Sequence, residues 1–187
     1  ETTLASLIGD RKINVKHTSL DNTSVRTGVV VADMLLTANT ADKNVTADHL
    51  QKIRQGTYQL NGGRDIDRAL NEMANEVKAG SLTGNKLLKR LEELSGVMIP
   101  ELEFNGQERV VPLIQAGSWL EGTNLVARAV KATGNPAAAD VLLKQPAVVD
   151  FFISYVRTEG KTKTAAPITA KLELALSNLK ELSEKKE

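Results

Sequence analysis

The stretch from Pro112 to Lys131, PLIQAGSWLEGTNLVARAVK, places the strongest constraint on the fold. Proline suits the first position of a helix, and Gly134 followed by Pro136 supplies a stop beyond its other end. At about 100° per residue, apolar side chains cover most of the circumference of such a helix. A helix that is apolar on most sides is usually buried on most sides. We therefore predict that this helix is central to the fold.

A narrow polar stripe interrupts that apolar surface. Glu121, Asn124 and Arg128 follow one another at helical spacing and so share one face. Two interpretations remain open. The stripe is either the solvated face of a half-buried helix, or a partly buried polar cluster in which Glu121 and Arg128 neutralise each other, because a buried charge is costly unless it is paired.

A second nearly apolar helix is predicted over residues 24–38. Asp33 lies inside its apolar run, which is uncommon for a carboxylate, and Arg26 lies on the same side two helical turns earlier. Asp33 is either a structural charge, exposed or paired with Arg26, or part of a site. We expect the two apolar helices to pack together, with Gly28 and Gly117 permitting close approach.

That packing would gather the polar residues of both helices into one network. We predict a ligand-binding site there, formed by Asp33, Arg26, Glu121, Asn124 and Arg128. In this interpretation the network is structural first, and it binds a ligand only if it opens into a cleft.

The rest of the chain predicts further amphipathic helices. They are expected near residues 46–58, 65–78, 85–94, 136–143, 146–156 and 167–184. Asn105-Gly106 between alternating apolar residues is typical of a hairpin turn, so a small β-hairpin is predicted over 102–111. The predicted fold is mainly α: a single-domain bundle, residues 1–187, of six to eight helices around two apolar central helices. Residues 1–23 would form an irregular arm and 184–187 a frayed tail.

Composition excludes several classes of function. The net charge of +1 gives no electrostatic case for nucleic-acid binding. No apolar run reaches the roughly 18 residues that a membrane-spanning helix needs. The chain has no cysteine and two histidines, and it shows no carboxylate-rich metal loop, so no metal or cofactor is predicted. His49 resembles a phosphorelay histidine only faintly, and a structural role is preferred for it.

Two short patterns resemble a known family. They are G-x-x-x-A-D at 28–33 and G-x-W-x-E-G at 117–122, carried by Gly28, Ala32, Asp33, Gly117, Trp119, Glu121 and Gly122. They are similar to the two signature helices of an uncharacterised family of bacterial exported or lipid-anchored helical proteins. The resemblance extends over residues 24–143 and implies an all-helical periplasmic or surface domain, without implying a reaction. This chain lacks the cysteine that would carry a lipid.

The functional interpretation follows from these observations. We expect a non-enzymatic exported bacterial domain, periplasmic or secreted, that binds an unknown protein or small molecule. The alternative is a hydrolase-like enzyme that uses a carboxylate cluster at Asp33 and Glu121, so the sequence leaves open whether the protein is an enzyme.

Overall fold

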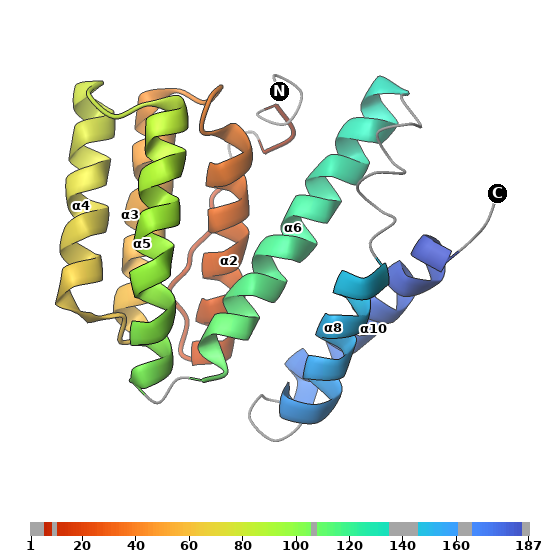
Figure 1. Ribbon diagram of the computed structural model, residues 1–187. Coiled ribbons are helices and arrows are strands. Elements are labelled where there is room, and N and C mark those ends of the chain that lie inside the picture. The colour runs from red at the N-terminus through yellow and green to blue at the C-terminus, as the bar shows by residue number, and fades with distance from the viewer. Residues whose placement is uncertain (1–5, 9–10, 106–107, 135–145, 161–165, 185–187) are drawn as a thin grey trace. The chain divides into compact units, whose positions relative to one another are not determined.

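The computed structural model describes residues 6–8, 11–105, 108–134, 146–160 and 166–184 (Figure 1). By its internal contacts the chain divides into two compact units, Glu1–Gly122 and Thr123–Glu187. Most of the described residues in both units are helical. The prediction of a mainly α fold is therefore confirmed.

In the described part of the first unit, residues 6–8 are helical and five longer helices follow. They are α2 (Leu20–Thr37), α3 (Lys43–Gln59), α4 (Gly63–Ala79), α5 (Gly84–Phe104) and α6 (Val110–Thr133), of which α6 continues into the second unit. The segment 11–17 that precedes α2 is irregular, as expected for the arm. The arm ends earlier than predicted, because the hydroxyl of Ser19 accepts a hydrogen bond from the backbone N–H of Asn22 and caps α2.

A single hydrophobic core holds α2, α3, α4 and α5 together. On α4, Ile66, Leu70, Met73 and Val77 are buried, and their spacing places them on one face. The other buried members come from the remaining helices and from the segments between them: Val15, Val30, Met34, Ala38, Ala47, Leu50, Ile53, Ala74, Leu82 and Leu87. Gly80 ends α4 with a φ of 80°, a conformation that glycine adopts without strain.

A second, smaller core joins the end of α5 to the start of α6. It is formed by the buried side chains of Leu60, Leu102, Val110, Val111 and Ile114. This core explains why the predicted β-hairpin over 102–111 is not found in the part of this segment that the structure describes. Residues 102–104 belong to α5 and 110–111 to α6, and both helices bury their apolar side chains against Leu60. Gly106 and Gln107 lie outside the described residues.

Asn105 therefore ends a helix instead of beginning a hairpin turn. It is the C-cap of α5, and its side-chain Nδ2 donates to the backbone carbonyl of Asn61 at 2.7 Å. Asparagine favours turns because its short side chain bonds nearby backbone groups, and a helix end satisfies it equally well.

The second unit contains α8 (Pro146–Tyr155), a π-helical turn (Val156–Gly160) and α10 (Ala166–Glu184). Two ion pairs join these elements: Lys180 to Asp150 at 2.6 Å and Arg157 to Glu173 at 2.7 Å. The predicted frayed tail beyond Glu184 lies outside the described residues.

In the described parts of the chain, no helix combines the length and the hydropathy that crossing a membrane would require.

Candidate functional site

The close contact between α2 and α6 positions the charged residues of the candidate site. A Cβ on Gly28 would overlap the backbone of α6, lying 2.8 Å from the nitrogen of Ser118. A Cβ on Gly117 would likewise overlap the backbone of α2 at Val25. The prediction that these two glycines allow the helices to approach closely is confirmed, and both lie in the first unit.

Next to this contact, Asp33 of α2 and Glu121 of α6 bind the same arginine, Arg11. The Nη2 of Arg11 donates to Oδ1 and Oδ2 of Asp33 at 2.6 and 2.7 Å and to Oε1 of Glu121 at 2.8 Å. The structure therefore brings together the two acids of the predicted network, through a cation that the network did not include.

Both carboxylates are nearly inaccessible to water. The side chain of Asp33 is 2% exposed and that of Glu121 is 10% exposed, whereas the side chain of Arg11 is 33% exposed. Burial raises the pKa of Asp33 above its usual value, and the hydrogen bonds and positive charge of Arg11 oppose that rise. Arg11 therefore favours the charged form of Asp33.

Arg26, the cation predicted to pair with Asp33, binds elsewhere. The Nη1 of Arg26 donates to the backbone carbonyl of Asn14 at 3.1 Å. Asn124 and Arg128 belong to the second unit, where both are exposed. Arg11 was missed because it lies 22 residues from Asp33 and 110 from Glu121, so no local pattern connects it to either acid.

A hollow of about 480 Å³ lies beside Arg11, and we call it the polar hollow. Its walls are formed by Arg11, Lys12, Asn44, Val45, Asp48, His49 and Lys52. His49 is 6% exposed, and its Nδ1 is buried without a hydrogen-bond partner among the described residues. Burial lowers the pKa of His49, and the nearby charge of Lys52 lowers it further, so the neutral form of this histidine is favoured.

Within the described ranges, no three side chains of His, Asp or Glu are grouped so that they could hold a metal ion.

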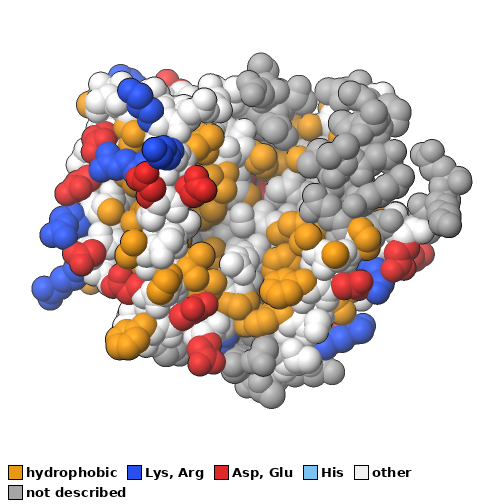
Figure 2. Space-filling model, in the orientation of Figure 1, with side chains coloured by type: hydrophobic (Ala, Val, Ile, Leu, Met, Phe, Trp, Pro, Cys, Tyr) orange, Lys and Arg blue, Asp and Glu red, His pale blue; other side chains and the backbone are white. Residues whose placement is uncertain are grey.

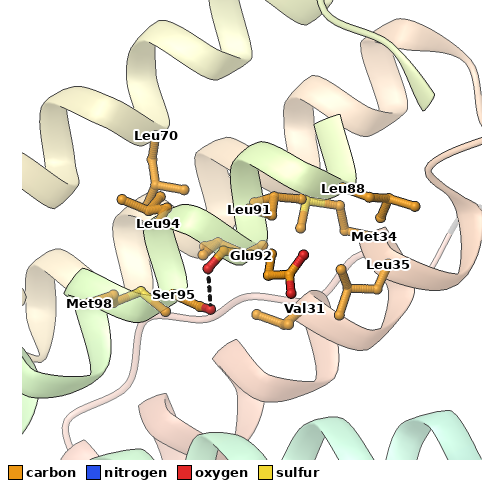
Figure 3. A pocket seen from close by; sticks show the side chains of 11 residues that line it. Val31, Met34, Leu35, Leu70, Leu88, Leu91, Glu92, Leu94, Ser95 and Met98 are labelled. Carbon is orange, nitrogen blue, oxygen red and sulfur yellow. Dashed lines mark hydrogen bonds between the residues drawn. The ribbon is translucent and has the colours of Figure 1, made fainter. Parts of the chain in front are cut away.

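A second cavity, the apolar hollow, lies on another side of the first unit (Figure 3). Its volume is about 290 Å³, and its lining comes from four helices: Val31, Met34, Leu35, Ile53, Leu70, Leu88, Leu91, Glu92, Leu94, Ser95 and Met98. Nine of these eleven residues are hydrophobic, so the walls offer an environment suited to an apolar molecule.

Glu92 and Ser95 are the two polar residues of the apolar hollow. The hydroxyl of Ser95 donates to the backbone carbonyl of Glu92 at 2.7 Å. In Figure 3 the carboxylate of Glu92 points toward Val31 and Leu35 of α2. Glu92 is exposed, so it places one negative charge at the rim of an otherwise apolar cavity.

Comparisons with known proteins supply no relative: no protein-family model matches the chain, and neither a curated protein nor a solved structure matches it.

Proposed function

We propose that this protein is a non-enzymatic binding domain and that the apolar hollow takes a small, largely apolar molecule. The observation that carries the proposal is the cavity of about 290 Å³ between α2, α3, α4 and α5, lined almost entirely by aliphatic side chains and methionine. Ligand sites in proteins are typically concave and apolar, with a few polar groups that orient the ligand.

The shape of α5 accounts for the open space. Leu87 and Leu102, near its two ends, are buried, while Leu91, Leu94 and Met98 between them are only partly buried. Figure 2 shows hydrophobic side chains exposed among charged ones on the face that carries α5. The middle of α5 therefore covers the core incompletely.

Two residues in α5 weaken this middle region. Pro100 lies inside the helix and has no N–H to donate to the carbonyl of Gly96, one turn earlier. Gly96 is the second of these residues, because a glycine in a helix interior lowers the stability of the helix by about 0.5–1 kcal/mol relative to alanine. An adaptable helix lined with methionine suits a cavity that must adjust to its ligand.

The size of the cavity limits the ligand. An engineered apolar cavity of about 150 Å³ binds benzene. At about 290 Å³ the apolar hollow offers nearly twice that space, which fits a two-ring aromatic or a short aliphatic chain.

The alternative, a hydrolase-like enzyme using Asp33 and Glu121, has less support. A general acid or base must reach its substrate, and both carboxylates bind Arg11 with their side chains 2% and 10% exposed. Their arrangement favours a structural or binding role over a catalytic one.

The family resemblance supports an exported protein. Its two patterns contain Gly28, Asp33, Gly117 and Glu121, which form the contact between α2 and α6 and the cluster around Arg11. We accordingly propose a periplasmic or secreted location. Fractionation of cells that produce the full-length gene product is expected to recover it outside the cytoplasm, and recovery with cytoplasmic markers would contradict this assignment.

A matched pair of variants tests the apolar hollow. Val31→Phe adds volume inside the cavity, whereas Val97→Phe makes the same change at a side chain on α5 that is 57% exposed and outside the lining. The neutral two-ring probe 6-propionyl-2-dimethylaminonaphthalene is expected to gain fluorescence with the wild type and with Val97→Phe, and to bind Val31→Phe at least about tenfold more weakly, because the added ring fills its space. Equal binding by the two variants would show that the probe does not occupy this cavity.

A further inference from the structure

The chain has three methionines and no cysteine, so its thioethers are the side chains that mild peroxide oxidises most easily. Met34 and Met73 are each 1% exposed, whereas Met98 on α5 is only partly buried and forms part of the wall of the apolar hollow. We propose that Met98 is a site of reversible oxidation and that its sulfoxide closes the apolar hollow to apolar molecules. The second half of this proposal rests on the function proposed above, and the first half does not.

Accessibility to solvent separates Met98 from the other two methionines. Met34 and Met73 are buried members of the main hydrophobic core, so an oxidant reaches their sulfurs only when the bundle opens locally. Met98 packs against that core as a partly buried neighbour. Figure 3 shows it toward one end of the apolar hollow, with Leu88 toward the other. An oxidant in solution therefore reaches Met98 without any opening of the bundle.

The reaction needs an oxidant that donates one oxygen atom, and hydrogen peroxide is the simplest of this class. A lone pair of the Met98 sulfur attacks one oxygen of the peroxide, and an S–O bond forms as the O–O bond breaks. The departing hydroxide takes the proton of the transferred oxygen and becomes water. The sulfur loses two electrons and the peroxide gains them. The product is a sulfoxide, which is polar where the thioether was apolar.

The surroundings of Met98 offer little to a sulfoxide oxygen. The side chain packs against both the main core and the smaller core between α5 and α6. The polar residues of the hollow are Glu92, whose carboxylate only accepts hydrogen bonds, and Ser95, whose hydroxyl already donates to the carbonyl of Glu92 at 2.7 Å. The new oxygen must therefore be hydrated, either by water drawn into the hollow or by movement of the side chain outward.

The backbone of α5 around Met98 resists such a movement weakly. Met98 lies midway between Gly96 and Pro100, and Pro100 has no N–H for the carbonyl of Gly96. Among the described residues, none from 91 to 99 makes a hydrogen bond or an ion pair to another helix. The nearest links are Arg90 to Glu76 at 2.6 Å and the side chain of Asn105 at the C-terminal end of α5. Since six of the eleven lining residues lie on α5, movement at Met98 alters the hollow itself.

The first experiment locates the oxidation. The folded full-length chain is treated with hydrogen peroxide, quenched with catalase at timed intervals, digested and analysed by mass spectrometry. The sulfoxide of Met98 is expected to form at least about tenfold faster than that of Met34 or Met73, because the buried sulfurs react only during opening. In urea the three rates should converge. Equal rates in the folded protein, or a faster reaction at Met34, would overturn the assignment.

The second experiment measures what the sulfoxide changes. Protein oxidised only at Met98 should melt about 2–6 °C lower than untreated protein. It should bind the neutral naphthalene probe at least about fivefold more weakly, because a polar group without a partner now faces the ligand. Methionine sulfoxide reductases for both sulfoxide epimers, supplied with dithiothreitol as the reductant, should restore the midpoint and the affinity.

Two conservative variants serve as controls, each compared with itself before and after peroxide. Leucine in place of methionine usually costs less than about 1.5 kcal/mol, so both variants should fold. Met98→Leu has no thioether at this position, so peroxide should change neither its midpoint nor its affinity for the probe. Met34→Leu retains Met98 and should respond to peroxide as the wild type does. An equal response of Met98→Leu would assign the effect to another residue and overturn the proposal.

The two halves of the proposal fail separately. If untreated protein binds no probe, the function proposed for the apolar hollow is wrong, and the thermal midpoint then decides alone. A lower midpoint that Met98→Leu does not show supports the oxidation site, and an unchanged midpoint overturns it. If the probe binds untreated protein and the sulfoxide at Met98 leaves its affinity unchanged, the closing of the hollow is overturned while the function proposed for it stands.

Discussion

Arg109 donates from Nε to Oδ1 of Asp21 at 3.0 Å, at the point where both α2 and α6 begin. These two residues are 88 positions apart in the chain, and Asp33 and Glu121 (121 − 33 = 88) have the same separation. The two helices therefore run parallel and in register, with an ion pair at one end of their contact and the Arg11 cluster at the other.

Between these two links, the contact depends on the absence of side chains at Gly28 and Gly117. A methyl group at either position would overlap the backbone of the opposite helix. We expect Gly28→Ala and Gly117→Ala each to lower the free energy of unfolding by about 1–3 kcal/mol or more, because the backbones must move apart to accept it. Denaturant unfolding measures the change.

Gly122→Ala is the control for the glycine contact, since a Cβ there meets no atom of the described residues within 4 Å. Alanine favours a helix over glycine by about 0.8–1 kcal/mol, so this variant should be neutral or more stable. If Gly28→Ala and Gly117→Ala are no less stable than Gly122→Ala, close packing of the two helices does not explain the glycines.

The stability conferred by Arg11 should depend on pH. In Arg11→Gln, Asp33 loses the positive charge beside it, so its folded-state pKa, already raised by burial, rises further above its usual 3.8. The folded form then binds protons that the unfolded form releases, so the variant loses stability as pH rises through that window. At neutral pH we expect the free energy of unfolding of Arg11→Gln to lie below that of the wild type by an amount near the lower end of about 3–5 kcal/mol, because Arg11 is one-third exposed. Near pH 4 the difference should be smaller.

Urea unfolding of wild type and Arg11→Gln across this range provides the measurement. A deficit that is constant with pH would show that Arg11 acts through packing of its alkyl chain and not through the charge of the two acids.

His49 should make the folded protein less stable in mildly acidic solution. Its pKa is lowered below the usual 6.5 by burial, and then by Lys52, while Asp48 acts in the opposite direction. As pH falls below about 6.5 the unfolded chain binds a proton that the folded chain does not yet accept, so stability falls until the folded-state pKa is reached. In His49→Leu the free energy of unfolding should fall less steeply as the pH is lowered over this interval. If it falls as steeply as in the wild type, His49 is not the cause of the loss of stability.

The sequence predicted the helices well because their signals are local. The apolar runs of α2 and α6 and the spacing of Ile66, Leu70, Met73 and Val77 on α4 each fit a helical period within one segment. The contact at Gly28 and Gly117 was also predictable, since two helices that are both largely apolar need a partner and glycine permits close approach.

The cation of the charged cluster was not predictable in this way. Asp33 in an apolar run indicates that a counter-charge is needed, and Arg26 on the same helix was the local candidate. The structure gives that role to Arg11, because a buried charge is paired by whichever cation the tertiary fold brings near. The hairpin signal at Asn105 failed for a related reason, since burial of Leu102 and Val110 against Leu60 favoured two helices.

The rim of the apolar hollow yields the last prediction. Glu92 is exposed and directs its carboxylate toward Val31 and Leu35 (Figure 3), so a ligand with a cationic end should place that end there. We expect 1-naphthylmethylamine to bind more tightly than the neutral 1-naphthalenemethanol, by up to about fivefold, because an exposed ion pair contributes roughly 0.2–1 kcal/mol. Calorimetric titration of Glu92→Gln should remove the difference while leaving the affinity for the alcohol unchanged, with Glu93→Gln, one position along α5 and outside the lining, as the matched control. A preference for the amine that persists in Glu92→Gln would assign the selectivity to another part of the surface.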